Sequence, residues 1–177
     1  MSKLFLSTLA ITGITGAFYL SKKNSDQRSC CYFPRERDSK YNIFRIGTLG
    51  HTLCLIEYLR SGSYINQTDM YGDTLMHWAA RHGNLEWGQL LVASSASIVN
   101  IKGDGGNTPL HLASYRNEDF VQFLISSGAL VNTKNNEGFT PLHNAVIHQK
   151  KDIAEILLQA GANPEIKNMY GKTPYDT

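Results

Sequence analysis

One short sequence pattern recurs along this chain at a nearly constant spacing. Full copies occupy 72–77, 106–111 and 138–143, and a shorter copy occupies 171–175. In one-letter code the copies read GDTLMH, GNTPLH, GFTPLH and GKTPY. Their threonines, at positions 74, 108, 140 and 173, are separated by 34, 32 and 33 residues. A period near 33 residues predicts a repeat protein, because one such unit is too small to bury a core alone and must stack on its neighbours.

Each full copy is followed by the same succession of helix signals. Threonine before proline favours a helix start, because the hydroxyl can cap free N–H groups and proline tolerates the first turn. A short helix is expected next, as in 77–82, and it should end at a residue that accepts a left-handed backbone. Those residues are Gly83, Asn117 and Gln149. A second, more apolar helix is expected at 85–92, 120–125 and 153–158.

The Gly-x-Thr-Pro-Leu-His pattern, the alanines of the first helix and the Gly-Ala pairs at 128–129 and 161–162 resemble the ankyrin repeat. The resemblance implies an all-α repeat solenoid, in which stacked helix-turn-helix units are joined by β-hairpin-like turns. Clear units would occupy 71–104, 105–136 and 137–169, after a degenerate unit at 38–70 and before a partial unit at 170–177. The chain also resembles the small ankyrin-repeat proteins of intracellular bacteria.

Two departures from the repeat pattern carry expectations of their own. Trp87 and Gly88 stand where two small or medium apolar residues are usual, so Gly88 is expected to make room for the indole. The unit that begins at 170 stops within its first helix, so the last complete unit has a partly open face. We expect Tyr170 and Tyr175, a partner, or nothing to cover that face.

The N-terminal part, outside the repeats, has a different composition. Residues 1–22 contain the apolar stretch Leu4–Leu20, and 23–37 read as a polar linker. The stretch is interpreted as a signal anchor, a cleaved signal peptide, or a buried or disordered tail, since about 17 helical residues nearly span a bilayer. Lys22, Lys23 and Arg28 follow it, and as an anchor they would leave the repeats in the cytoplasm. Cleavage would instead give a secreted domain.

The sequence indicates no catalytic, metal or cofactor site. His77, His111 and His143 recur in register, which predicts a shared structural role in hydrogen bonds between neighbouring turns. No pair of histidines has the helical spacing of a zinc site, and no nucleophile–base pair stands out. The formal net charge is +2 and the basic residues are scattered, so nucleic acid is not an expected partner.

The resemblance implies a non-catalytic scaffold that binds another protein through its hairpin tips and first-helix faces. Aromatic residues, Met and Arg are frequent at these positions, as they are in interface cores. The alternative is a truncated or regulatory fragment of a larger ankyrin assembly. The partner-binding residues carried over by motif are Met70, Tyr71, Asp73, Arg81, His82, Asp104, Asn107, Tyr115, Arg116, Asn136, Glu137, Phe139, Ile147, His148, Met169, Tyr170 and Lys172.

Overall fold

The computed structural model describes residues 44, 52–60 and 64–176. All of them belong to the second of the two units into which the chain divides, Arg35–Thr177. The apolar stretch Leu4–Leu20, the linker at 23–37 and much of the degenerate unit at 38–70 lie outside the described residues. Within the described part, no helix is both long enough and apolar enough to cross a membrane.

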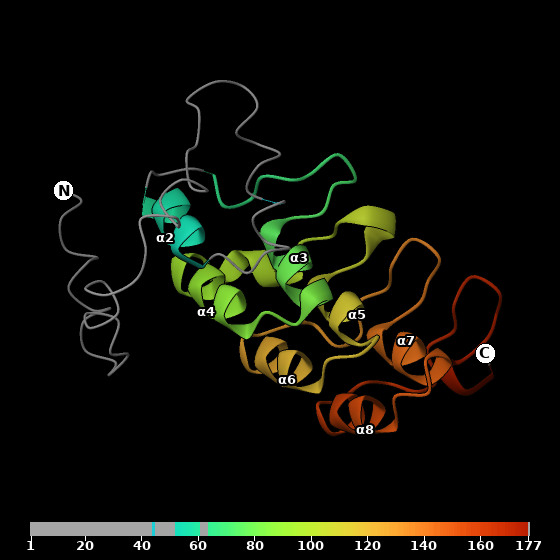
Figure 1. Cartoon of the computed structure of the whole chain (residues 1–177). Coiled ribbons are helices and arrows are strands. Elements are labelled where there is room, and N and C mark those ends of the chain that lie inside the picture. The colour runs from blue at the N-terminus through green and yellow to red at the C-terminus, as the bar shows by residue number, and fades with distance from the viewer. Residues whose placement is uncertain (1–43, 45–51, 61–63, 177) are drawn as a thin grey trace. The chain divides into compact units, whose positions relative to one another are not determined.

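The described residues form α-helices and short 3-10 helices, with one isolated antiparallel bridge between Thr68 and Thr74 in place of any strand. Figure 1 shows the elements in chain order. They are α2 (Thr52–Arg60), α3 (Leu75–His82), α4 (Leu85–Ser94), η2 (Ala96–Asn100), η3 (Asp104–Gly106), α5 (Pro109–Ala113), α6 (Glu118–Ser126), α7 (Pro141–Ile147), α8 (Lys151–Gln159) and η4 (Pro174–Asp176). The predicted all-helical repeat fold is confirmed.

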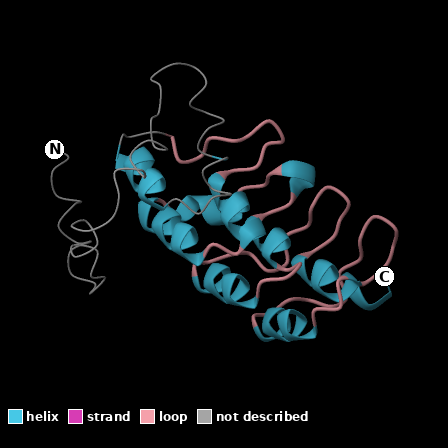
Figure 2. Cartoon of the chain, viewed as in Figure 1, coloured by secondary structure: helices cyan, strands magenta, loops and turns pink. Residues whose placement is uncertain are grey.

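The helices of these units stack in two layers. Helices α3, α5 and α7 contact one another in succession, and α2, α4, α6 and α8 form the second succession. Within a unit, α3 packs on α4, α5 on α6 and α7 on α8. The loops that precede α3, α5 and α7 extend side by side on one side of the stack (Figure 2). Each helix pair therefore buries its apolar face against its own partner and against the next pair.

The recurring threonines begin the first helix of each clear unit. At Thr140 the backbone N–H donates to Nδ1 of His143 at 3.1 Å, and the hydroxyl lies 2.8 Å from the same nitrogen. Thr74 and Thr108 make the same contacts with the histidines three residues later. Histidine thus takes the place of the Glu or Gln of an ordinary capping box.

The first helices end in two different ways. Gly83 and Gln149 have φ values of 67° and 56°, so both adopt the predicted left-handed backbone. The prediction for Asn117 is wrong: its φ is −130°, and its side chain caps α6 by accepting from Phe120 N at 2.9 Å. The physical reason is that this unit has one residue fewer between its threonine and the start of its second helix. Asn117 therefore both occupies the place of Gly83 and caps the second helix, whereas Gly83 and Asn84 divide these two roles in the preceding unit.

Gly88 has a different role from the one expected. A Cβ atom on Gly88 would lie 2.8 Å from Phe123 Cε1 and 2.9 Å from Phe120 Cζ. The glycine therefore makes room for the two phenyl rings of the next unit, not for the indole of its neighbour Trp87. Trp87 is itself buried, with 1 % of its surface exposed.

The last helix pair is covered at the C-terminal side by the short helix η4, which packs on α7. Pro174 of η4 is buried. Tyr170 and Tyr175, the two residues considered for this cover, are 64 % and 58 % exposed. The short helix that begins at the end of the fourth sequence copy therefore provides the cover, and Tyr170 and Tyr175 remain largely exposed to solvent.

Candidate protein-binding surface

The three recurrent histidines form a buried row that joins neighbouring units. Each is 0 % exposed, and each lies with Nε2 close to the backbone carbonyl that precedes the next threonine. The distances are 3.0 Å from His77 to Asn107 O, 3.0 Å from His111 to Phe139 O, and 3.3 Å from His143 to Lys172 O. Because Nδ1 accepts from a threonine N–H, Nε2 carries the proton and donates. The predicted structural role is confirmed.

Burial also keeps these imidazoles neutral. Desolvation lowers the pKa of His77 and of His143, and it lowers the pKa of His111 to about 4. A neutral imidazole whose two nitrogens are both hydrogen-bonded within the repeats has no lone pair or proton to offer a ligand. The described residues also contain no group of three or more His, Cys, Asp or Glu side chains arranged to hold a metal ion.

Three of the four described hairpin tips are held in shape by an Asp or Asn side chain at the base of the turn. The Oδ1 atom of Asn135 accepts from Glu137 N at 3.0 Å and from Phe139 N at 2.9 Å. Asn168 does the same for Tyr170 N and Lys172 N, and Asp69 for Tyr71 N and Asp73 N. Successive tips are then joined by backbone bonds of 2.9 Å, from Asn136 N to Gly105 O and from Met169 N to Glu137 O. The tips form one preformed row.

The prediction that Asp73 belongs to the exposed partner-binding surface is wrong. The residue is 1 % exposed, and its carboxylate forms an ion pair of 2.5 Å with Arg81. The same carboxylate accepts from Asp104 N at 3.0 Å. Gly103 has no side chain, and a Cβ atom there would collide with Asp73 Oδ1. Asp73 therefore supports the second tip from within and orients Arg81.

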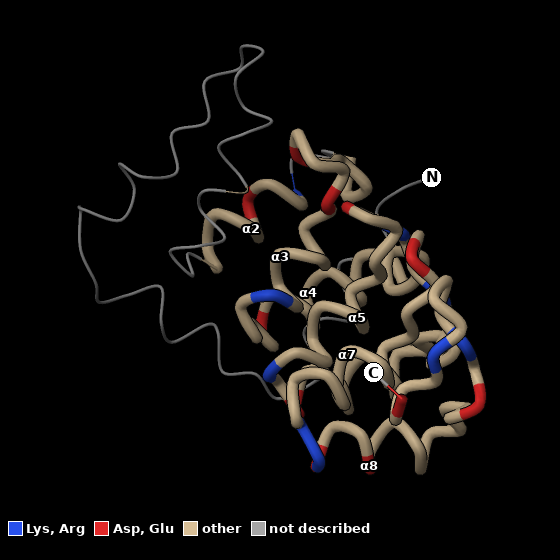
Figure 3. Tube along the Cα trace, turned by 90° about the vertical axis from the view of Figure 1, so that its right-hand side faces the viewer, with Lys and Arg blue, Asp and Glu red and all other residues tan. Residues whose placement is uncertain are grey.

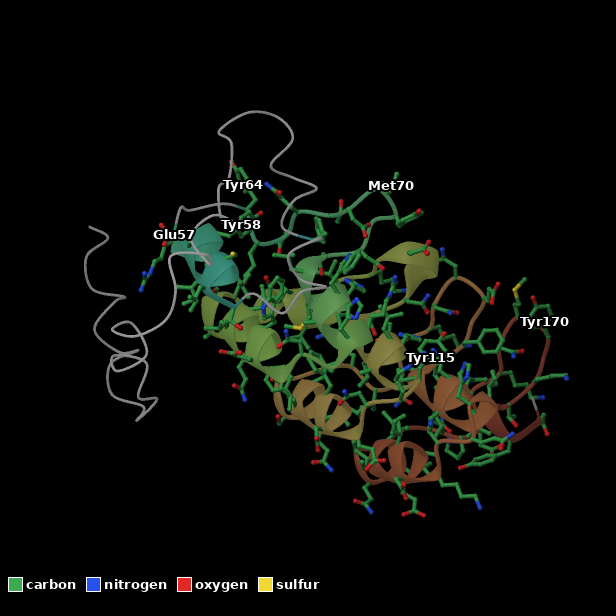
Figure 4. The ribbon with its side chains drawn as sticks, viewed as in Figure 1. Glu57, Tyr58, Tyr64, Met70, Tyr115 and Tyr170 are labelled. Carbon is green, nitrogen blue, oxygen red and sulfur yellow. The ribbon has the colours of Figure 1, made fainter. Side chains whose placement is uncertain are left out.

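Of the other sixteen residues expected at the surface, thirteen are exposed, and Asn107, Tyr115 and Phe139 are half-buried. The first and last described tips carry the same pair of large apolar residues. Met70 and Tyr71 are 72 % and 66 % exposed, and Met169 and Tyr170 are 65 % and 64 % exposed. Figure 4 shows Met70 and Tyr170 on loops at opposite ends of the row. The two tips between them carry polar residues, Asp104 and Asn136 among them.

A second line of predicted residues lies at the C-terminal ends of the first helices. Its members are Arg81, His82, Tyr115, Arg116, Ile147 and His148. The ring of Tyr115 meets the ring of His148 edge to face, with centroids 4.6 Å apart. Burial raises the pKa of Tyr115. Tyr115 thus couples two units at this edge, and Figure 4 places it in the middle of the stack.

The structure brings four of the predicted residues together around one groove near the last tip. The groove has a volume of about 390 Å³ and is lined by Phe139, Ile147, Asn168, Tyr170 and Lys172. The ring of Phe139 meets Tyr170 at a centroid distance of 6.4 Å. The sequence prediction missed Asn168, which is 6 % exposed. Its register was the available signal, since it stands five residues before Thr173 as Asn135 stands five before Thr140.

Charge does not single out one face of the described repeats. Figure 3 shows basic and acidic residues interspersed along the trace. Interspersed charge of both signs gives no extended positive field of the kind that binds nucleic acid. The surface is therefore distinguished by shape and by its exposed apolar side chains.

The comparison with family profiles defines the class of protein. The profile of the ankyrin repeats, in three copies, matches 46–135 and 106–168. The chain therefore belongs to the ankyrin-repeat family, and ankyrin repeats are protein–protein interaction modules.

Two curated relatives are similar to parts of this chain. One is a Danio rerio protein described as putative palmitoyltransferase ZDHHC13, with 29 % identity over 140 residues. That match covers 78 % of this chain and 22 % of the relative. The other is ankyrin repeat domain-containing protein 37 of Xenopus tropicalis, 39 % identical over 56 residues, or 32 % of this chain and 34 % of the relative. The chain thus spans about a fifth to a third of the relatives it matches.

Proposed function

We propose that this chain is a non-catalytic scaffold that binds a partner protein along the row of hairpin tips and the adjoining first-helix ends. The observation that carries the proposal is that the row is both exposed and fixed. Asx-type hydrogen bonds shape three of the four described tips, Asp73 supports the other, and backbone bonds connect the last three tips. A preformed surface loses little conformational entropy on binding, which leaves more of the contact energy for affinity.

The proposal is tested by affinity purification with the full chain and a charge-reversed variant. Arg116 is exposed at the end of a first helix, and Lys151 is exposed on the outer helix α8. Partners bound through the proposed surface should be lost with Arg116→Glu and retained with Lys151→Glu, which makes the same charge change elsewhere. Equal retention by both variants, or equal loss from both, would refute this assignment of the binding surface.

The alternative proposal is that the chain acts as a regulatory part of a larger ankyrin assembly. It is supported by the larger size of both curated relatives. Light scattering and urea unfolding of the purified chain distinguish the two. A monomer that unfolds in one cooperative transition favours the independent scaffold, whereas obligate association or aggregation favours the assembly.

We also propose a membrane-anchored protein with cytoplasmic repeats, and as the alternative a secreted one. The anchor proposal depends on Leu4–Leu20 and the lysines that follow. Cell fractionation with N-terminal sequencing decides. A new N-terminus near Phe18 would exclude the anchor, and an intact Met1 or Ser2 in the membrane fraction would exclude cleavage.

A further inference from the structure

Asn168 carries a buried hydrogen-bond donor that the tip itself does not use. Its Oδ1 atom accepts from Tyr170 N at 2.9 Å and from Lys172 N at 3.1 Å, so the amide orientation is fixed. Its Nδ2 atom is buried and has no hydrogen-bond partner among the described residues. The side chain lines the groove near the last tip. A buried donor without an acceptor destabilises the free protein, and a ligand acceptor would relieve that cost.

The preceding unit shows how the equivalent donor is satisfied there. Asn135 has the same place in its tip as Asn168, and its Nδ2 donates to Asn107 Oδ1 at 3.0 Å. Asn107 and Phe139 occupy equivalent positions, each directly before the threonine of its unit. In the next unit, Phe139 therefore stands where the acceptor would be. One residue difference removes the partner of Asn168 and supplies an aromatic wall.

The remaining lining residues indicate what the groove can bind. Phe139, Ile147 and Tyr170 present apolar surface, and Ile147 is 44 % exposed. Lys172 is an exposed cation in the same lining. Apolar surface beside one N–H donor and one cation is complementary to an apolar side chain next to a carboxylate. A charge-assisted bond from an amide and a lysine to one carboxylate is stronger than a bond between neutral groups.

We propose that this groove binds an acidic segment of the partner protein, in which a large apolar residue neighbours an Asp or Glu. The apolar side chain packs on Phe139 and Ile147, and the carboxylate accepts from Asn168 Nδ2 and pairs with Lys172. Access to the covered amide requires a rim side chain to move, and Tyr170 is a rim residue with 64 % of its surface exposed. This inference rests on the proposed protein-binding function and specifies the chemistry of the partner.

The test is selection of random peptides displayed on phage against the full chain, followed by affinity measurement of the enriched peptides. The decisive variant is Asn168→Asp, which retains the oxygen that holds the tip but replaces the donor with an acceptor. Asp69 shows that an aspartate is compatible with this position, because it accepts from Tyr71 N and Asp73 N in the same way. Leu130→Ala is the matched control, because it removes apolar surface that is 63 % exposed and lies outside both the groove and the proposed binding surface.

The enriched peptides are expected to share an apolar residue beside an Asp or Glu. Their affinity should fall about tenfold with Asn168→Asp, with Lys172→Gln, or when the peptide carboxylate is replaced by an amide. It should be unchanged with Leu130→Ala. Failure to enrich any peptide, peptides without an acidic residue, or affinity unaffected by Asn168→Asp would overturn the inference. Peptides lost with Arg116→Glu but not with Asn168→Asp would overturn it while leaving the protein-binding function in place.

Discussion

The buried histidines depend on one protonation state. In each clear unit, Nδ1 accepts from the threonine at the helix start and Nε2 donates to the next unit. Protonation of Nδ1 would replace that accepted bond by repulsion between two donors. In the last copy, Asp176 accepts instead from Thr173 N and from the Thr173 hydroxyl, and these bonds lower the pKa of its carboxyl. Asp176 thus takes the capping role of the histidine, but its carboxylate has no N–H group that could donate to a following unit.

The stability of the domain should therefore decrease in mild acid. The pKa of His111 is about 4 in the folded chain and 6.5 in the unfolded chain, so between these values the unfolded state binds more protons. The free energy of unfolding should be fully retained above pH 6.5 and fall as the pH decreases toward 4. This residue alone contributes on the order of 3 kcal/mol to that loss. Urea unfolding at a series of pH values measures it.

A matched pair of variants assigns the effect to the buried row. His111→Gln cannot titrate, so its unfolding free energy should be lower at pH 7 but less dependent on pH between 6.5 and 4. His82 is exposed, and His82→Gln should retain the wild-type dependence. An unchanged pH dependence in His111→Gln would contradict the role given to burial. His77 and His143 account for the dependence expected to remain, because burial lowers both pKa values.

At the scale of the elements, Gly88 shows how one helix is shaped for the next. Replacement of glycine by alanine inside a helix usually adds about 0.5–1 kcal/mol of stability, because alanine loses less backbone entropy. In α4 the new methyl group would collide with the rings of Phe120 and Phe123. Phe120 is fully buried and has no room to move, and overpacking of this kind costs about 1–3 kcal/mol. Steric overlap should therefore outweigh the gain in helix propensity.

Gly88→Ala is thus expected to lower the free energy of unfolding by about 1–2 kcal/mol. Gln89→Ala, at the exposed neighbouring position of α4, is the control and should change it by less than about 0.5 kcal/mol. Chemical denaturation followed by circular dichroism measures both. Stabilisation of the domain by Gly88→Ala would show that the helices separate enough to admit the methyl group, contrary to the packing described.

The elements also show what sequence patterns reveal and what they do not. The helix pairs and the histidine row were predictable, because each depends on residues within one period or on an identical residue in the next. The burial of Asp73, the cap at Asn117 and the role of Gly88 were mispredicted. The role of Gly88 depends on contacts with the following unit, and that of Asp73 on contacts with the following tip. The cap at Asn117 depends on the spacing between the threonine and the second helix of its own unit. The groove is similar: Asn168 became distinctive only when Phe139 proved to occupy the position of its acceptor.

For the described repeats as a whole, stability should depend on how many neighbours a helix pair has. Helix α5 contacts both α3 and α7, whereas α7 contacts α5 on one side and the short η4 on the other. Leu110 of α5 and Leu142 of α7 are equivalent residues with 1 % and 0 % exposure. Replacement of a buried leucine by alanine costs about 2–5 kcal/mol at either site, but it interrupts the stack in different places.

Amide hydrogen exchange on the full chain should distinguish the two positions. Leu110→Ala should reduce protection in α3–α4 and in α7–α8, because the central pair couples the units on both sides. Leu142→Ala should reduce it mainly in α7–α8 and leave α3–α4 close to wild type. Leu158→Ala is the control, since that side chain is 36 % exposed and its loss should have little effect on either region. Equal loss of protection across all described units in both buried variants would instead mean that the repeats unfold as one cooperative unit, with no local opening of α7–α8.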